Sequence, residues 1–144
     1  MLRGGIDHLD LTVKDPVSSE AFYRTVLGYM GFEPVRLAHG NTHLRIFQST
    51  DGGRRLFSIA LQPAKHEGNH DRYLPGLHHV AFRAASRADV DGLHQVLREI
   101  GAEVLDPPAE YPHYAPGYYA LFFADPDGLK LEFVHMPTPP ELAA

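Results

Sequence analysis

Apolar and polar residues alternate along several short stretches of the chain, which is the pattern of β-strands with one buried face. In the first stretch, residues 6–13, the apolar positions 9, 11 and 13 would face the core, and His8 would lie on the opposite, polar face. The same reasoning predicts further strands at residues 33–37, 42–48, 54–62, 77–83, 118–124 and 129–135.

Two segments between these strands have helical spacing of apolar residues and begin with residues typical of helix starts. Asp15 followed by Pro16 predicts the first start, with Phe22, Val26 and Tyr29 recurring at helical spacing behind it. Ser86 to Asp89 has the pattern of a capping box and predicts the second start. The second helix would stop at Gly101, and its inward residues would be Val90, Leu93, Val96, Leu97 and Ile100.

The chain looks like one unit written twice. The sequence around His79 has a weaker copy around His8, 71 residues earlier, and the same offset places Ser86 over Asp15. The predicted fold class is therefore α+β, built from two β-α-β-β-β modules in a single domain. We expect a first module at about residues 4–62, a linker at 63–75, a second module at about 76–136 and a tail at 137–144.

A candidate metal site follows from the direction of the side chains. His8, His79 and Glu132 would all lie on strand faces turned away from the helices. Two imidazoles and one carboxylate form a known set of ligands for a divalent metal with open coordination positions. The alternative is that these are ordinary surface residues, since the chain has ten histidines.

Composition narrows the classes of function. The net charge of −5, with scattered Lys and Arg, gives no reason to expect nucleic acid or an anionic membrane as partner. With no cysteine, a metal would be held by nitrogen and oxygen only. No apolar segment is long enough for a signal core or a membrane span, so we expect a cytoplasmic location.

The chain resembles the vicinal oxygen chelate superfamily, which includes glyoxalases, bleomycin-resistance proteins and extradiol dioxygenases. The resemblance is carried by His8, Phe22-Tyr23 followed by Leu27-Gly28, His79 in Leu-His-His-Val-Ala-Phe, and Glu132 after Asp-Pro-Asp-Gly. It implies paired modules that form a curved, barrel-like sheet around a metal cleft. It also implies that His8, His79 and Glu132 hold Fe, Mn, Ni or Zn.

A fourth ligand position of the family departs from the pattern. In glyoxalase I, which the chain resembles, a glutamate occupies this position. The equivalent position here is near Ser58, which is a poor metal ligand. Gln62 lies on the same strand face as Ser58 but further along the strand. The resemblance therefore implies a three-ligand site of the extradiol-dioxygenase or fosfomycin-type thiol-transferase kind more than a glyoxalase I-like lyase.

Further residues are candidates for chemistry or substrate contact. His113 and Tyr118 could transfer protons, while His43, Arg45, Ser58 and Tyr114 could contact a small substrate with adjacent oxygens. Residues 107–117 are expected to form a long loop beside the site. A metal-free drug-binding protein of the bleomycin-resistance type is the alternative, and a homodimer is expected in either case.

Overall fold

The computed structural model describes residues 3–36 and 45–137 and divides the chain into two compact units, Met1–Gly68 and Asn69–Ala144. We call them the first and second unit and describe each by itself. The boundary between them lies inside the predicted linker, where residues 64–79 form turns and irregular backbone.

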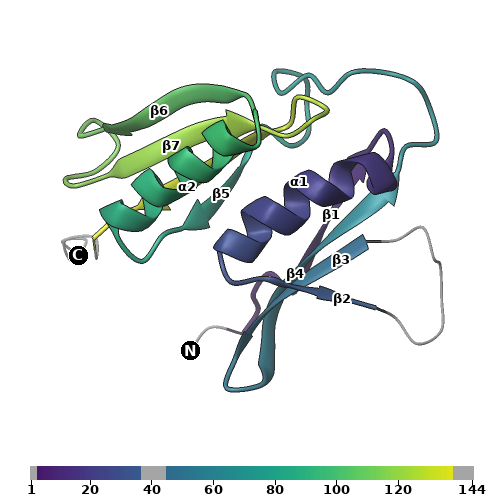
Figure 1. The fold of residues 1–144 in the computed structure, drawn as a ribbon, viewed down its shortest axis with the longest axis horizontal. Coiled ribbons are helices and arrows are strands. Elements are labelled where there is room, and N and C mark those ends of the chain that lie inside the picture. Colours follow the sequence, from purple (N-terminus) through teal and green to yellow (C-terminus); the bar gives the residue numbers. More distant parts are fainter. Residues whose placement is uncertain (1–2, 37–44, 138–144) are drawn as a thin grey trace. The chain divides into compact units, whose positions relative to one another are not determined.

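The first unit is a four-stranded sheet with one helix on one of its faces (Figure 1). The strand order is β1-β4-β3-β2, with β1 parallel to β4 and the other neighbours antiparallel. Apolar side chains of the helix and of one sheet face form the core, including Tyr23, Val26, Phe47, Ile59 and Leu61. The elements are β1 (His8–Val13), α1 (Pro16–Tyr29), β2 (Glu33–Val35), β3 (Arg45–Asp51) and β4 (Arg54–Pro63).

The second unit repeats this arrangement. Its strand order is β5-β8-β7-β6, with β5 parallel to β8 and the other neighbours antiparallel. Its core joins one helix to one sheet face and includes Val90, Leu93, Leu97, Phe123 and Leu131. The elements are β5 (Val80–Arg83), α2 (Arg87–Glu99), β6 (Val104–Glu110), β7 (Tyr119–Ala124) and β8 (Lys130–His135).

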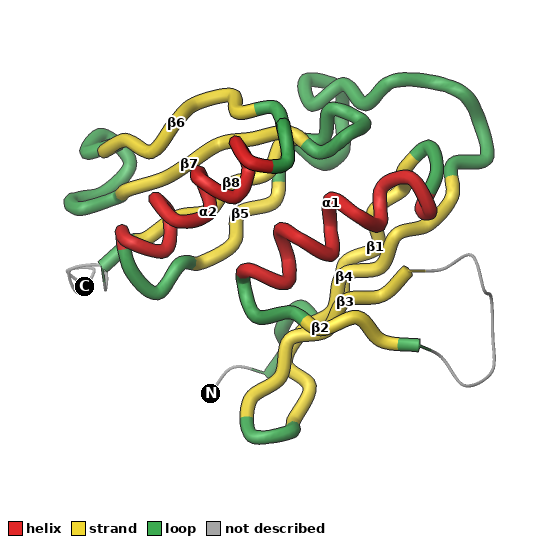
Figure 2. Tube along the Cα trace, viewed as in Figure 1, coloured by secondary structure: helices red, strands yellow, loops and turns green. Residues whose placement is uncertain are grey.

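The two units thus share one topology, β-α-β-β-β, with one helix and four strands in each. Figure 2 colours these helices and strands along the trace. The predicted α+β class and its duplicated module are confirmed. No helix within the described residues is long and apolar enough to cross a membrane.

Both helix starts are where the sequence predicts them. The Asp15 carboxylate accepts hydrogen bonds from the amides of Val17 and Ser18, and Pro16 is the first helical residue. In the second unit, the Ser86 hydroxyl accepts from the Asp89 amide at 3.1 Å. Ile100 differs from its prediction: it is 43% exposed, because α2 ends at Glu99 and the chain turns at Gly101, which has a φ of +67°.

Replacing Ser86 with Ala tests the cap of α2. The substitution removes the side-chain acceptor of the Asp89 amide in the first turn of α2, so we expect the free energy of unfolding to fall by about 1 kcal/mol. Denaturant titration measures this change, and Ser86→Asp, which keeps an acceptor, should restore most of it. Equal stability of Ser86→Ala and the parent would contradict the capping role.

The strands depart from the prediction in length. β6 continues to Glu110 through Pro107 and Pro108, with two irregularities in its register, so the expected loop at 107–117 is shorter and spans residues 111–118. β3 extends to Asp51 and leaves only Gly52 and Gly53, both with positive φ, as the hairpin turn. β5 begins at Val80, directly after His79.

Candidate functional site

Glu132 is a buried carboxylate on the sheet face of the second unit that α2 does not cover. It lies on β8 beside Ala81 of β5 and Phe122 of β7, and its side chain is 2% exposed. Buried carboxylates require hydrogen-bond or ionic partners. Both oxygens of Glu132 have one.

Tyr118 and His79 are these partners. The Tyr118 hydroxyl donates to Glu132 Oε1, and His79 Nε2 lies 3.0 Å from Glu132 Oε2. Tyr118 comes from the chain just before β7, and His79 from the chain just before β5. The predicted pair of His79 and Glu132 is therefore brought together within one unit.

His78 contacts His79 from its other side. The two Nδ1 atoms are 2.7 Å apart, and the rings meet edge to face with centroids 5.0 Å apart. Desolvation, followed by the charges of His79 and Lys130, lowers the pKa of His78 below its usual value. A side chain that the sequence did not single out thus completes a row of four: Tyr118, Glu132, His79 and His78.

Aromatic rings from the segment before β7 lie beside this row. The rings of Tyr111 and Tyr114 stack at 5.8 Å, and Tyr111 also meets Tyr118 and Phe122 edge to face. The ring centroids of His113 and Tyr114 are 4.3 Å apart, and Tyr114 is 62% exposed. These rings form a surface that we call the aromatic cluster, next to Glu132.

Tyr118 is held in its protonated form. Burial is the main cause that raises its pKa, and the hydrogen bond and charge of Glu132 act in the same direction, because a phenolate beside a carboxylate is unfavourable. Burial likewise raises the pKa of Tyr111. At neutral pH, Tyr118 is thus a hydrogen-bond donor to Glu132 and a poor base.

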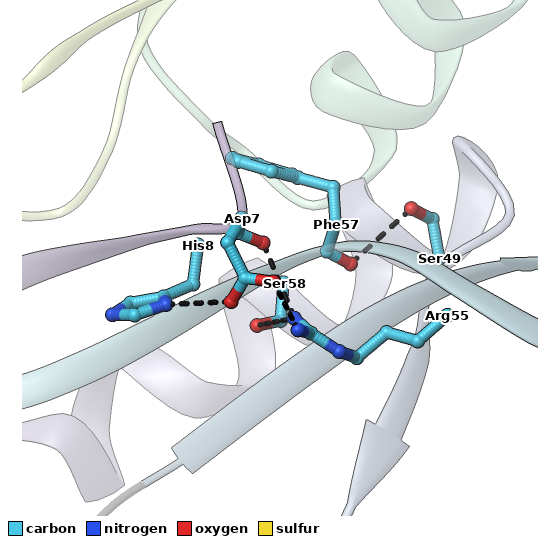
Figure 3. Close-up of polar contacts among 6 residues, drawn as sticks. All are labelled: Asp7, His8, Ser49, Arg55, Phe57 and Ser58. Atoms are coloured by element: carbon cyan, nitrogen blue, oxygen red, sulfur yellow. Dashed lines mark hydrogen bonds and ion pairs between the residues drawn. The ribbon is translucent and has the colours of Figure 1, made fainter. Parts of the chain in front are cut away.

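His8 lies at the start of β1 in the first unit, opposite Ser58 of β4 in the strand register. Its Nδ1 is 2.9 Å from Asp7 Oδ1, and its side chain is 61% exposed. Figure 3 shows Asp7 between His8 and Arg55, whose guanidinium pairs with Asp7 Oδ2 and reaches Ser58 Oγ at 3.4 Å. Asp7, His8, Arg55 and Ser58 therefore form one polar group.

Arg55 reaches this group because of a register shift. Ser49 pairs with Phe57 and Thr50 with Arg55, so one extra residue on β4 interrupts the alternation of faces. Without that shift, Arg55 and Ser58, three positions apart, would point to opposite faces.

Arg45 lies elsewhere. It is opposite Leu61 on β4, and its Nε donates to Glu20 Oε2 of α1 at 2.5 Å. The structure thus places Arg45 on the helix-covered face of the sheet, and not with His8 and Ser58.

The other predicted positions are placed as follows. Gln62 lies opposite Thr12 and donates to Asp10 Oδ2 at 2.7 Å. His43 lies outside the described residues. Within residues 3–36 and 45–137, no group of three or more His, Asp or Glu side chains is arranged to hold a metal ion; His79 and Glu132 are two donors of the second unit, and His8 belongs to the first.

The donor pair of the second unit lies at hydrogen-bond distance, a separation that two neighbouring ligands of an octahedral ion can also have. Neighbouring ligands of an octahedral ion with bonds of about 2.1 Å are about 3.0 Å apart, and His79 Nε2 and Glu132 Oε2 are 3.0 Å apart. One imidazole nitrogen and one carboxylate oxygen also suit Fe, Mn, Ni and Zn. These two donors are of the kinds that divalent metals accept, although within the described residues no third His, Asp or Glu completes a group around them.

Asp7, His78 and Arg55 were not predicted as parts of a site. For Asp7 and His78 the signal was in the repeat, because each directly precedes one of the two matched histidines. For Arg55 no signal was available, since strict alternation along β4 assigns it to the other face.

Comparison with known proteins gives a family. A sequence model described as the Glyoxalase/Bleomycin resistance protein/Dioxygenase superfamily matches residues 5–133. The protein YqjT of Bacillus subtilis (strain 168) is 28% identical over 130 residues, which are 88% of this chain and 95% of YqjT.

Solved structures agree in fold. The glyoxylase/bleomycin resistance protein/dioxygenase domain from Frankia sp. EAN1pec is 26% identical with a TM-score of 0.70, over 93% of this chain and 98% of that one. The fosfomycin resistance protein FosX from Listeria monocytogenes has a TM-score of 0.67 at 19% identity, over 95% and 97% of the two chains, and is similar in fold alone.

Proposed function

Because the chain belongs to the Glyoxalase/Bleomycin resistance protein/Dioxygenase superfamily, we propose that it is a metal-dependent enzyme acting on a small substrate with two adjacent oxygen atoms. The observation that carries this proposal is the pair of His79 and Glu132, whose donor atoms are 3.0 Å apart on the sheet face that α2 does not cover. Divalent Fe, Mn, Ni and Zn are Lewis acids, and a bound ion would stabilise negative charge that develops on the substrate oxygens.

Each residue of the pair has a distinct part. Glu132 supplies a negative charge in a dry position, where it attracts a cation more strongly than it would in water. His79 supplies an imidazole nitrogen beside that carboxylate. The Tyr118 hydroxyl holds one carboxylate oxygen and leaves the oxygen nearer to His79 for the metal.

We propose His8 as the third ligand. This step is supported by the sequence repeat that matches His8 to His79, and by the polar face on which His8 lies with Ser58. A set of two histidines and one glutamate is closest to the extradiol-dioxygenase or thiol-transferase type, with a glyoxalase I-like lyase as the alternative.

Tyr118→Phe tests the support of Glu132. The substitution keeps the aromatic ring and removes the hydroxyl that donates to Glu132. Hydrogen-bond partners that orient a metal ligand typically contribute 10- to 100-fold to metal affinity. We therefore expect the metal to bind about tenfold more weakly. Isothermal titration calorimetry measures the change. Tyr119→Phe is the matched control, since its hydroxyl donates to Asp91 of α2; equal losses in both variants would contradict a specific role for Tyr118.

A second candidate function is supported by the aromatic cluster. The stacked rings of Tyr111 and Tyr114, with His113 against them, form a surface suited to a flat organic molecule. A metal-free protein that sequesters such a ligand would use these rings and would not require His79. Ligand-induced thermal stabilisation that persists in chelator would favour this function.

Metal content separates the two candidates. The protein is purified, loaded in turn with Fe²⁺, Mn²⁺, Ni²⁺ and Zn²⁺, desalted and analysed for bound metal, together with His8→Ala, His79→Ala and a surface control, His70→Ala. The metalloenzyme proposal predicts about one ion per chain in the parent and control, with losses in the other two. If the His79→Ala variant retained the metal, the metalloenzyme proposal would be contradicted.

A further inference from the structure

The residues that directly precede His8 and His79 make matching contacts in the two units. Asp7 Oδ1 lies 2.9 Å from Nδ1 of His8, and Nδ1 of His78 lies 2.7 Å from Nδ1 of His79. Asp7 and His78 are related by the same offset of 71 residues as the two histidines. In each unit, therefore, Nδ1 is engaged by the preceding residue and Nε2 is the nitrogen turned elsewhere.

We propose that Asp7 and His78, at equivalent positions of the repeat, are positioning residues that present His8 and His79 through their Nε2 atoms. This inference rests on the proposed function, because it concerns the residues assigned there as ligands. The nitrogen of a histidine that binds metal is set by the hydrogen bond that the other nitrogen makes.

The two positions act differently because their chemistry differs. An ionised aspartate can only accept a hydrogen bond, so Asp7 requires the proton of a neutral His8 to be on Nδ1. Nε2 of His8 is then unprotonated and ready for a metal. Arg55 pairs with the other oxygen of Asp7 and with the Asp7 backbone carbonyl, which keeps this carboxylate in place.

His78 can both donate and accept, and this matters for His79. Without metal, His79 Nε2 donates to Glu132, so its Nδ1 accepts and His78 must donate from Nδ1. With a metal on Nε2 of His79, the proton of His79 would be on Nδ1, and Nδ1 of His78, with its own proton on Nε2, would accept a hydrogen bond from it. The imidazole of His78 satisfies His79 in both states, which a fixed acceptor such as aspartate would not do.

Histidine tautomers measured by long-range ¹H–¹⁵N correlation in the full-length protein test this proposal without any metal. At about pH 8, where ordinary imidazoles are neutral, metal-free protein should show the proton on Nδ1 in His8 and His78, and on Nε2 in His79. Asp7→Ala should release His8 to the mixture of tautomers of an exposed histidine. Asp10→Ala, on the same face of β1, should leave it unchanged.

Zn²⁺ affinity supplies the second readout. We expect Asp7→Ala and His78→Phe each to weaken binding about 10- to 100-fold, with recovery in His78→Asn, which keeps an acceptor near the position of Nδ1. His70→Phe is the matched surface control, and circular dichroism checks that each variant is folded. Parent-like affinity of His78→Phe, or an unchanged His8 tautomer in Asp7→Ala, would overturn the proposal.

These outcomes are distinguishable from failure of the proposed function. If the parent protein bound no metal, the proposed metal-dependent enzyme would be contradicted. The tautomers of His8 and His78 in metal-free protein would still decide whether Asp7 and His78 hold the histidines as described.

Discussion

Glu132→Gln is expected to abolish metal binding while the protein remains folded. The amide has the size of the carboxylate and can still accept from Tyr118 and pair with His79, so the buried polar atoms stay satisfied. The negative charge is lost, however, and a neutral amide is a much weaker ligand. Loss of a residue that only hydrogen-bonds to a metal ligand typically lowers metal affinity 10- to 100-fold. Because Glu132 is itself the proposed ligand, we expect metal affinity to fall by more than about 100-fold.

Calorimetric titration with Zn²⁺ and Mn²⁺ measures this loss. Glu103→Gln is the matched control, as it removes an exposed carboxylate of the same unit and should leave affinity unchanged. Glu132→Ala should in addition lower stability by about 1–3 kcal/mol, because Tyr118 and His79 lose their partner. A Glu132→Gln protein with parental affinity would show that the metal is bound elsewhere.

Phe123→Ala is expected to lower the free energy of unfolding by about 3–5 kcal/mol, which is the usual cost of emptying a buried phenylalanine site. Phe123 is fully buried on β7, beside Leu131 of β8, on the face that α2 covers. Since domains of this kind have about 5–15 kcal/mol of stability, this loss is a large share of the total.

Urea titration measures the effect, and Leu74→Ala, at an exposed position, should change stability by about 0.5 kcal/mol or less. Phe122, the preceding residue, lies on the same sheet face as Glu132. Phe123→Ala should therefore keep its metal affinity under conditions where it is folded. Loss of metal in the folded variant would contradict the separation of the core face from the site face.

Local rules were enough to predict much of the fold. Asp15 and Ser86 cap helices because their side chains offer acceptors to otherwise unpaired amides, and this property is visible in the sequence. The repeat predicted one topology for both units, and alternation in β1 placed His8 on the face opposite to the buried Leu11 and Val13. These features depend on near neighbours or on a pattern that occurs twice.

Errors arose where longer-range pairing decided the outcome. Pro107 and Pro108 suggested a loop, yet they lie in β6, the outer strand of its sheet, where missing amides and register irregularities are tolerated. The predicted substrate contact of Arg45 stays a prediction, while the structure pairs its side chain with Glu20 of α1, on the same sheet face as the buried Phe47. Period-two alternation already assigned both residues to the same face.

The contact between His79 and Glu132 was predictable from the sequence, and the residues that surround this pair were less so. The pairing of His79 with Glu132 follows from strand order, because β5 and β8 are neighbours. The contacts of Tyr118 with Glu132 and of Arg55 with Asp7 depend on where a loop ends and on a register shift. Neither contact can be predicted from the two-residue alternation of side chains along a strand.

A crystal structure of the protein grown with Mn²⁺ or Zn²⁺, with the metal located by its anomalous scattering, is the most direct measurement. We expect one anomalous peak per chain, about 2.0–2.2 Å from His79 Nε2 and from a carboxylate oxygen of Glu132, with Nε2 of His8 as the third protein ligand. A peak held by other side chains, or no peak beside His79 and Glu132 at saturating metal, would contradict the proposed metal centre.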